Sequence, residues 1–233
     1  RWGDYDGNSF NDIDVAMTEN QSEETSAGIE ISSNGTGPLS WIVGMNYFDQ
    51  EVNYDFDLRI GAIGGGNVPA STGWGTYWLD TYGVFASVDY ELSDAWTISV
   101  GGRYTKEEKD IYWRPSSTEY AQNQRITLAA ALLPNEDGEE WSSFDPKVTL
   151  TYSFANGGIA YATYSTGFKS GGYNAPTRRG GEALDPEELD MIEFGYKADL
   201  TNNLRLTSSV FFYDYTGLQV TRAAKGTGTV TTE

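Results

Sequence analysis

The stretch "YGVFASVDYELSDAWTISVGGRY", from Tyr82 to Tyr104, decides the fold. Apolar and polar residues alternate along it on both sides of a short polar break, "LSDA". The apolar side chains that this alternation places on one face are Tyr82, Val84, Ala86, Val88, Tyr90, Leu92, Trp96, Ile98, Val100 and Tyr104. Because side chains of a strand point to its two faces in turn, this stretch predicts a β-hairpin with one apolar face.

The same unit occurs in three other places. These are "ETSAGIEIS" with "LSWIVGMNYF", "KVTLTYSF" with "IAYATYSTGF", and "MIEFGYKADL" with "LRLTSSVFFYDY". The sequence therefore predicts about eight strands in four hairpins with short turns. Long loops are expected between the hairpins, at about Asp57 to Asp80, Tyr112 to Ser143 and Lys169 to Glu188. Short turns at one end and long loops at the other are typical of a bacterial outer-membrane barrel.

Composition limits the classes of function. The 233 residues carry a formal charge of -19 and contain neither Cys nor His. Disulfides, thiolate metal sites and Ser-His-Asp or Cys-His catalysis are thereby excluded within this chain. The acidic balance argues against nucleic-acid binding, because phosphates need a basic surface, and it fits contact with cations or cationic complexes. No apolar run approaches the 18 or so residues of a membrane-spanning helix.

A membrane barrel explains the alternation better than a soluble β-sandwich does. Aromatic residues lie near both ends of the apolar faces, as in the two girdles of such a barrel. The opposite faces are polar along their whole length and carry Glu30, Asp89, Arg103, Glu193, Lys197, Asp199 and Arg205. We therefore expect an all-β fold, a partial antiparallel transmembrane barrel. The mean hydropathy of -0.48 fits this fold, because only alternate strand residues face lipid.

Three segments resemble TonB-dependent outer-membrane receptors. They are "YGVFASVDYELSDAWTISVGGRYTKEEKD", "SFDPKVTLTYSFANGGIAYATYSTGFKSGGYNAP" and "LDPEELDMIEFGYKADLTNNLRLTSSVFFYDYTGLQV". The third is similar to a family pattern, carried here by Pro186, Glu187, Glu193, Gly195 and Lys197. The resemblance runs from about Gln21 to Arg222, in the family's order.

The resemblance implies energy-coupled uptake across the bacterial outer membrane. The implied cargo is a ferric siderophore or a similar scarce complex such as a cobalamin. The implied partners are the TonB energy-transducing complex, outer-membrane lipid and lipopolysaccharide. No enzymatic activity and no cofactor are expected. The family has a 22-stranded barrel filled by an N-terminal plug, whereas this chain shows about eight strands, no plug-like segment and no terminal aromatic residue. Residues 1–233 are therefore expected to be a central part of such a barrel.

Two groups of residues are candidate ligand contacts in the extracellular loops. The aromatic group is Trp74, Tyr77, Trp78, Trp113 and Tyr173, whose rings can stack on a planar ligand. The alternative for these rings is packing at the membrane interface. The basic group is Arg178 and Arg179, which can clamp a carboxylate or phosphate. The sequence favours their pairing with nearby acidic residues.

Charges on the polar faces are candidates for the barrel interior: Glu30, Arg103, Glu193, Lys197 and Arg205. They would hold the plug or line the path, or else pair across neighbouring strands. Asp4 to Asp14 has the oxygen-rich spacing of a calcium loop but lacks its glycine and terminal Glu, so an acidic loop is favoured and no metal site is expected.

Two other classes stay open at this point. One is a complete eight-stranded membrane barrel with an adhesin or structural role, since eight strands can close. The other is a soluble, acidic β-sandwich that binds a partner. The lack of a signal peptide and of a terminal aromatic residue counts against the small barrel. An enzyme is the weakest option, because carboxylates without a cleft do not make a glycosidase-like site.

Overall fold

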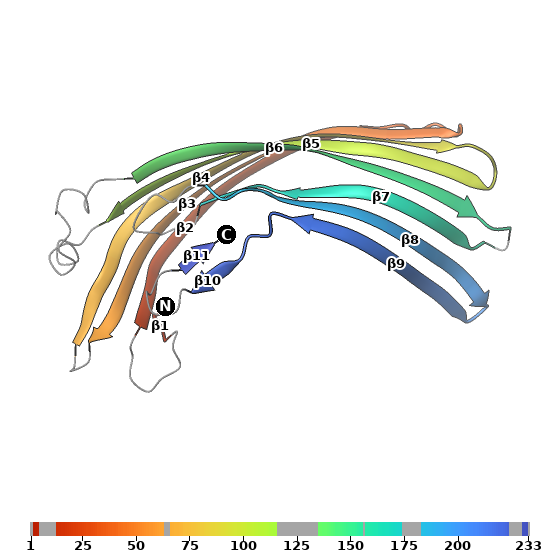
Figure 1. The fold of residues 1–233 in the computed structure, drawn as a ribbon. Coiled ribbons are helices and arrows are strands. Elements are labelled where there is room, and N and C mark those ends of the chain that lie inside the picture. Colours follow the sequence, from red (N-terminus) through yellow and green to blue (C-terminus); the bar gives the residue numbers. More distant parts are fainter. Residues whose placement is uncertain are drawn as a thin grey trace.

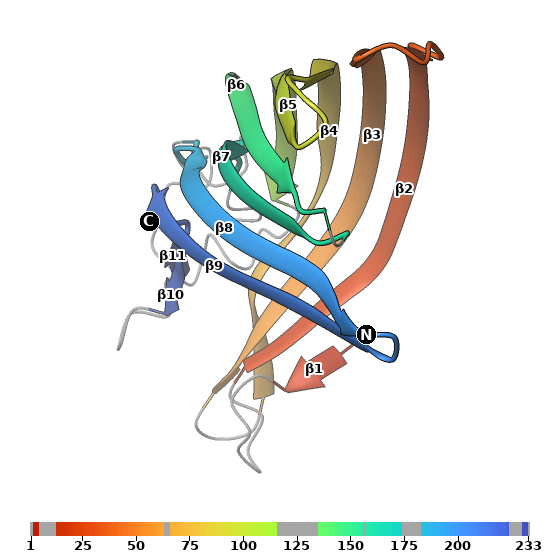
Figure 2. The same ribbon diagram turned by 90° about the vertical axis from the view of Figure 1, so that its right-hand side faces the viewer.

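The computed structural model describes residues 2–4, 13–62, 66–115, 135–155, 157–173, 183–223 and 230–232. Its main feature is one antiparallel sheet in which strands β1 to β9 lie side by side in chain order. The strands are β1 (Trp2–Asp4), β2 (Ile13–Ser32), β3 (Leu39–Ala62), β4 (Gly66–Glu91), β5 (Trp96–Pro115), β6 (Asn135–Ser153), β7 (Ile159–Lys169), β8 (Glu187–Thr201) and β9 (Leu204–Thr216). A separate pair joins β10 (Thr221–Ala223) to β11 (Val230–Thr232). Figures 1 and 2 show the large sheet as an arched, twisted wall.

The prediction of about eight strands in four hairpins is confirmed by β2 to β9. The predicted hairpins are β2–β3, β4–β5, β6–β7 and β8–β9, each paired residue by residue. Their turns are short, and one of them places Gly157 at φ 82°, a conformation that glycine adopts readily. The wall stays open, because β2 and β9 are not neighbours in the described sheet. This arrangement excludes a two-sheet sandwich and a closed eight-stranded barrel for the described strands.

The predicted long loop from Asp57 to Asp80 is wrong. Strands β3 and β4 continue through this region and stay paired as far as Ala62 and Gly66. The register shifts once, between Leu58 and Arg59. Trp74, Tyr77 and Trp78 therefore lie on β4 and not in a loop, and Trp113 lies on β5. The predicted loop from Tyr112 to Ser143 is wrong at both ends, because β5 runs to Pro115 and β6 begins at Asn135. Of the third predicted loop, residues 170–173 and 183–186 lie outside the strands, and residues 174–182 are not among the described residues.

One face of the sheet, here called the apolar face, exposes large hydrophobic side chains. On β5, for example, Val100 is 46% exposed and Tyr104 is 47% exposed. Only Ile111 and Ala198 are buried hydrophobic residues among those described. A soluble protein rarely exposes such a continuous apolar surface, whereas a membrane barrel turns it to lipid. The described part of the chain has no helix suited to cross a membrane.

Aromatic rings mark both borders of the apolar face. At the short turns, Trp96 contacts Tyr152 with ring centroids 4.8 Å apart, and Phe154 links Tyr152 to Tyr196. Toward the other end, Tyr47 and Tyr82 lie 5.1 Å apart. Along β4, Tyr82 and Tyr90 are separated by roughly 27 Å of strand at about 3.4 Å per residue. That length is comparable with an apolar band about 25 Å tall.

Beyond Tyr47 and Tyr82 the same face becomes charged. Tyr47 donates to Asp80 at 2.6 Å, and Lys106 pairs with Glu140 at 2.9 Å. Charges of this density do not face hydrocarbon, so the strands extend past the bilayer into water. We call this part of the wall, beyond the Tyr47–Tyr82 contact, the rim. The opposite face of the sheet is called the polar face, and it lines the lumen of a closed barrel.

Substituting Val100 tests the orientation of the wall. In the complete receptor, Val100→Arg places a charge near the middle of the apolar face, and we expect the free energy of folding into bilayers to worsen by about 2–4 kcal/mol. Ser99→Arg, one residue away on the polar face, is the matched control and is expected to cost much less. Urea titrations of refolding into lipid vesicles measure both values. Equal costs for the two variants would contradict the assignment of faces.

Candidate functional site at the rim

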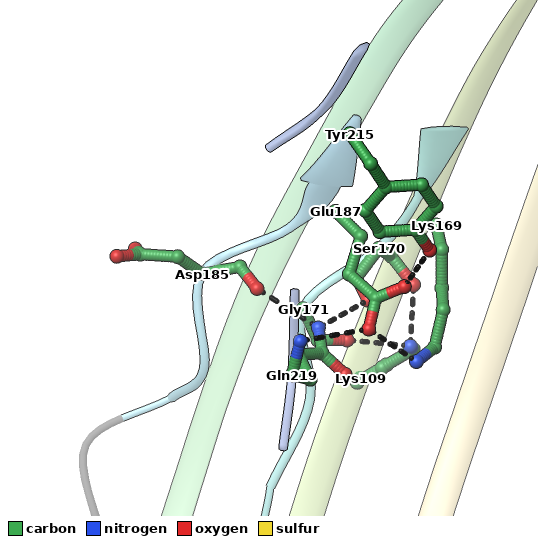
Figure 3. A network of polar contacts seen from close by, with 8 residues as sticks. All are labelled: Lys109, Lys169, Ser170, Gly171, Asp185, Glu187, Tyr215 and Gln219. Atoms are coloured by element: carbon green, nitrogen blue, oxygen red, sulfur yellow. Dashed lines mark hydrogen bonds and ion pairs between the residues drawn. The ribbon is translucent and has the colours of Figure 1, made fainter. Parts of the chain in front are cut away.

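The polar face of the rim carries a cluster of hydrogen bonds and ion pairs, and Figure 3 shows its members other than Glu107. We call this cluster the rim network. It joins residues of β5, β7, β8 and β9 and the loops that follow β7 and β9: Glu107, Lys109, Lys169, Ser170, Gly171, Asp185, Glu187, Tyr215 and Gln219. Two of its members, Ser170 and Glu187, are among the few buried polar residues in the described chain.

Glu187 is the centre of one half of the network. It begins β8, is 4% exposed and pairs with Lys169 at 2.9 Å. Tyr215 donates its hydroxyl proton to the same carboxylate, and the backbone N–H of Gln219 donates to it at 2.9 Å. These donors, Tyr215 first, lower the pKa of Glu187 to about 2. The buried carboxylate is thus fully partnered, as a buried charge must be.

Lys109 is the centre of the other half. Its ammonium group donates to Ser170 Oγ and to the carbonyl of Gly171, the latter at 2.7 Å. It also pairs with Glu107 at 3.3 Å and lies 5.4 Å from the ring centre of Trp141. Ser170 Oγ in turn donates to Glu107. The Lys109 side chain is only 12% exposed, so solvent screens these contacts weakly.

Gln219 connects the two halves. Its side-chain amide donates to the carbonyl of Ser170 at 3.3 Å and to that of Asp185 at 2.8 Å, while its backbone contacts Glu187. The loop after β9 is thereby tied to both flanks of the loop between β7 and β8. The described ends of both loops are thereby held together at the polar face of the wall.

Glycine makes the close packing of this loop possible. A Cβ on Gly171 would overlap the carbonyl of Leu184 and the indole of Trp141. Gly172 pairs with Leu184 as an isolated β-bridge, which closes the base of the loop. The structure thus shows close approach of a backbone and an indole to Gly171.

Three aromatic side chains lie beside the rim network. Trp141 and Tyr173 make an edge-to-face contact with centroids 6.4 Å apart. Burial, aided by Asp137, raises the pKa of Tyr173 to about 12, and burial, aided by Glu107, raises that of Tyr77 to about 12. The Tyr173 hydroxyl is buried without a hydrogen-bond partner in the described structure. It is therefore a polar group ready to bond to a ligand or an ordered water.

The structure separates the predicted ligand contacts. In the register, Tyr77 is opposite Ile111, and Tyr77 and Tyr173 belong to the polar side. Trp74 and Trp78 are on the other side of β4, where Trp74 contacts Tyr112 and Trp78 donates to Glu51 at 3.2 Å. The Trp113 side chain, Arg178 and Arg179 lie outside the described residues, as do most of Asp4 to Asp14. No cluster suited to a metal ion is found in the described part.

The predicted interior charges lie on the polar face with separate partners. Arg103 donates to Asn46 at 2.9 Å, and Glu193 accepts from Tyr161 at 2.6 Å. Lys197 lies 5.5 Å from the Tyr161 ring centre. Arg205 pairs with Asp199 at 2.6 Å, as the cross-strand alternative predicted. No partner of Glu30 is found in the described structure.

Sequence reasoning missed Lys109, Ser170 and Gln219 as members of one cluster. Lys109 belongs to the "TKEEKD" segment that carries the resemblance, and Glu187 to the Pro-Glu pattern. Both were visible as motif residues, but the contact of Lys109 with Ser170 joins positions 61 residues apart in the sequence. The arrangement brings hydrogen-bond donors, acceptors and aromatic rings together at the rim.

The fold and its faces define a sector of an outer-membrane type β-barrel. Residues 1–232 match the family model "TonB dependent receptor-like, beta-barrel", and the chain belongs to this family. Members of the family are receptors and transporters in the outer membranes of Gram-negative bacteria. The predicted family and fold class are thus confirmed.

Solved structures agree on the fold. The ferric yersiniabactin uptake receptor FyuA from Yersinia pestis is 13% identical, with a TM-score of 0.75 over 90% of this chain and 31% of FyuA. The siderophore receptor PiuA from Acinetobacter baumannii is 17% identical, with a TM-score of 0.61 over 89% of this chain and 34% of PiuA. The ferric-catecholate import receptor Fiu from E. coli K12 is 14% identical, with a TM-score of 0.56 over 94% of this chain and 34% of Fiu. The chain thus spans about a third of each. No curated protein matches it.

Lys109→Met tests whether Lys109 holds the loop. Loss of its charged hydrogen bonds is expected to lower the opening free energy of the loop base by about 2 kcal/mol. The readout is hydrogen exchange of the Leu184 amide, which donates to Gly172 at 2.7 Å, and it should become about 30-fold faster in the complete receptor. Lys106→Met, on the other face, is the control. If the Leu184 amide exchanges at an unchanged rate in the Lys109 variant, Lys109 does not hold the base of the loop.

The pKa of Glu187 sets the acid limit of the network. Because the folded-state pKa, about 2, lies below the ordinary 4.5, the contacts are present above pH 4.5 and are lost only as the pH falls toward 2. Pepsin, which acts in this range, should leave residues 217–220 of the complete receptor intact at pH 4 and cleave them near pH 2. Glu187→Gln removes the charge and should allow cleavage at pH 4 as well. If this variant resists pepsin at pH 4, the Glu187 carboxylate is not needed to hold residues 217–220 against the wall.

Proposed function

We propose that this chain is a sector of the barrel wall of a receptor that takes up a ferric siderophore, or a similar scarce metal complex or cobalamin, across the outer membrane. The observation that carries the proposal is the match of the whole chain to the TonB-dependent receptor barrel. Three solved structures with the same fold, those of FyuA, PiuA and Fiu, are receptors for siderophores or ferric complexes and support the cargo class. Uptake would be driven through the TonB complex, acting on a plug that belongs to a longer protein.

The rim is the proposed place of ligand capture. Tyr77 and Tyr173 lie on the polar side, above the apolar band, and Tyr173 has a buried hydroxyl without a partner. Rigid rings give contact area at a small cost in conformational entropy. The rim network fixes the bases of two loops there, so ligand contacts in these loops would be partly preorganised. Arg178 and Arg179 lie between β7 and β8 in the sequence, outside the described residues. They remain candidates for contact with an acidic group of the ligand.

The structure disfavours Trp74 and Trp78 as lumen contacts, because they share a face with the lipid-facing residues of β4. They are suited to contact the lipopolysaccharide layer around the barrel, where Trp is common at membrane interfaces. The proposal therefore assigns lumen contacts to Tyr77 and Tyr173 and outer contacts to Trp74 and Trp78.

Uptake of radiolabelled iron tests the proposal. A strain lacking the complete receptor is expected to lose uptake of iron from the iron-starved culture medium of its parent, and the wild-type gene should restore it in a TonB-dependent manner. Tyr173→Ala should weaken cell-surface binding about tenfold, which corresponds to about 1.4 kcal/mol. Tyr82→Ala, in the apolar face, should leave binding unchanged. Uptake that is equal with and without the receptor would refute an iron complex as cargo.

A further inference from the structure

The backbone pairing between β6 and β7 stops while both strands continue toward the rim. The ladder between them ends at the pair Lys147 and Ser165. Beyond this pair, β6 stays paired with β5 as far as Asn135, and β7 stays paired with β8 as far as Lys169. The described parts of β6 and β7 share no backbone pair there, and in Figure 1 β6 runs on past the end of β7. We call this interruption of the wall the seam.

The sequence of β6 suits an open edge at the seam. Pro146, directly beyond the last pair, has no N–H group, and proline in sheets is confined to strand edges, strand starts and bulges. Glu136, Asp137, Glu139 and Glu140 lie further toward the rim, and charged side chains keep an exposed edge from pairing with other strands. The sequence therefore specifies the interruption.

The seam faces water and not lipid. On the side of the apolar face, Glu140 of β6 pairs with Lys106, and Asp190 of β8 accepts from Tyr164 at 2.7 Å. Charged groups of this kind lie outside the hydrocarbon. Unpaired backbone groups are tolerated at the seam because water can bond to them.

Among the described residues, side chains and not backbone pairs hold the two sides of the seam together. Lys109 on β5 donates to Ser170 Oγ and to the carbonyl of Gly171, just after β7. Ser170 Oγ in turn donates to Glu107 on β5. Since β6 lies between β5 and β7, the chain after β7 passes over the polar face of β6 to make these contacts. We call the contacts of Lys109 and Glu107 with Ser170 and Gly171 the clasp.

The other described contacts across the seam are weaker. Thr166 donates to Asp145 at 3.3 Å, beyond the usual range of about 2.5–3.0 Å for such a bond. Trp141 meets Tyr173 edge to face with centroids 6.4 Å apart. The Lys109 side chain, by contrast, is charged and only 12% exposed, and hydrogen bonds of charged groups are the stronger ones. The clasp is therefore the main attachment among these contacts.

The Glu187 half of the rim network lies on one side of the seam. Glu187 on β8 binds Lys169 on β7, Tyr215 on β9 and the backbone of Gln219 just after β9. Backbone pairing also joins β7 to β8 and β8 to β9 up to their rim ends. These three strands and the bases of their loops thus form one unit, and strands β2 to β6 form the other.

We propose that the seam is a movable joint in the rim, held closed by the clasp. The unit of β7 to β9 turns against β2 to β6 about the pair Lys147 and Ser165, where the shared ladder ends. With the clasp broken, the seam opens a passage between the polar face and the outer side of the wall, above the bilayer. Rigid units that turn about a short shared segment are a common form of conformational change. The inference goes beyond the proposed function, because it concerns the wall alone and not the cargo.

Distances between two spin labels, measured by double electron–electron resonance, test the joint in the complete receptor in detergent. Residues 1–233 contain no Cys, so labels are attached at introduced cysteines after any Cys elsewhere has been replaced. The pair Glu23→Cys and Glu188→Cys lies across the seam, whereas the pair Glu23→Cys and Ser142→Cys lies on one side of it. All three side chains are exposed.

Lys109→Met should broaden the distribution of the Glu23–Glu188 distance and shift its mean by about 5 Å, the spacing of two strands. The Glu23–Ser142 distance should stay unchanged, because that part of the sheet keeps its pairing. Lys106→Met, whose ion pairs do not cross the seam, is the matched control and should change neither distance. If Lys109→Met leaves the Glu23–Glu188 distance as it was, or shifts both distances alike, the seam is not a joint.

Glu187→Gln separates the two halves of the rim network. This variant loses contacts within the unit of β7 to β9 and keeps the clasp, so the loop after β9 is released while the Glu23–Glu188 distance stays the same. A shift of that distance in Glu187→Gln would contradict the division into two units. Iron uptake enters neither readout, so failure of the proposed function would be recognised separately from failure of the joint.

Discussion

The structure depends on one constraint: each backbone N–H and C=O that faces hydrocarbon must be bonded within the sheet. This requirement explains the continuous registers from β2 to β9, with shifts at only three described places in the pairings of β2–β3, β3–β4 and β8–β9. With pairing fixed, the two-residue alternation alone decides which side chains meet lipid. The described chain therefore needs almost no core, and its stability depends on pairing and on the apolar face.

The same constraint shapes the polar face. A single layer of strands has no interior in which to bury large polar groups. Arg103 and Tyr161 therefore lie across glycines of neighbouring strands and make hydrogen bonds to side chains of the same sheet. Only above the bilayer, where loops fold back on the wall, does a buried polar cluster form around Lys109 and Glu187. Buried ionic groups are tolerated there because every one of them is partnered within a few residues of a tight loop base.

The sequence predicted the fold well where lipid imposes alternation and poorly where it does not. From Tyr82 to Tyr104 one face meets lipid, so the pattern is visible and the hairpin is found correctly. Between Asp57 and Asp80 the sequence keeps no such alternation, and its Gly and Pro residues made two long paired strands look like a loop. The rim network was also beyond prediction, because Lys109 and Ser170 meet only through the register of β5, β6 and β7. Glu187, by contrast, was visible as a motif residue, although its role was not.

The last strand of the described sheet, β9, has an open edge. All the residues of β9 are exposed, including Phe211 and Phe212 on opposite faces, and one side of its backbone has no partner in the described sheet. Such an edge is a site of aggregation in water and is not tolerated in lipid. In the barrels of this family such edges are joined when the sheet closes. The constraint that orders each hairpin thus also explains why these proteins are closed barrels, and the polar face of this sector would line the inside of one.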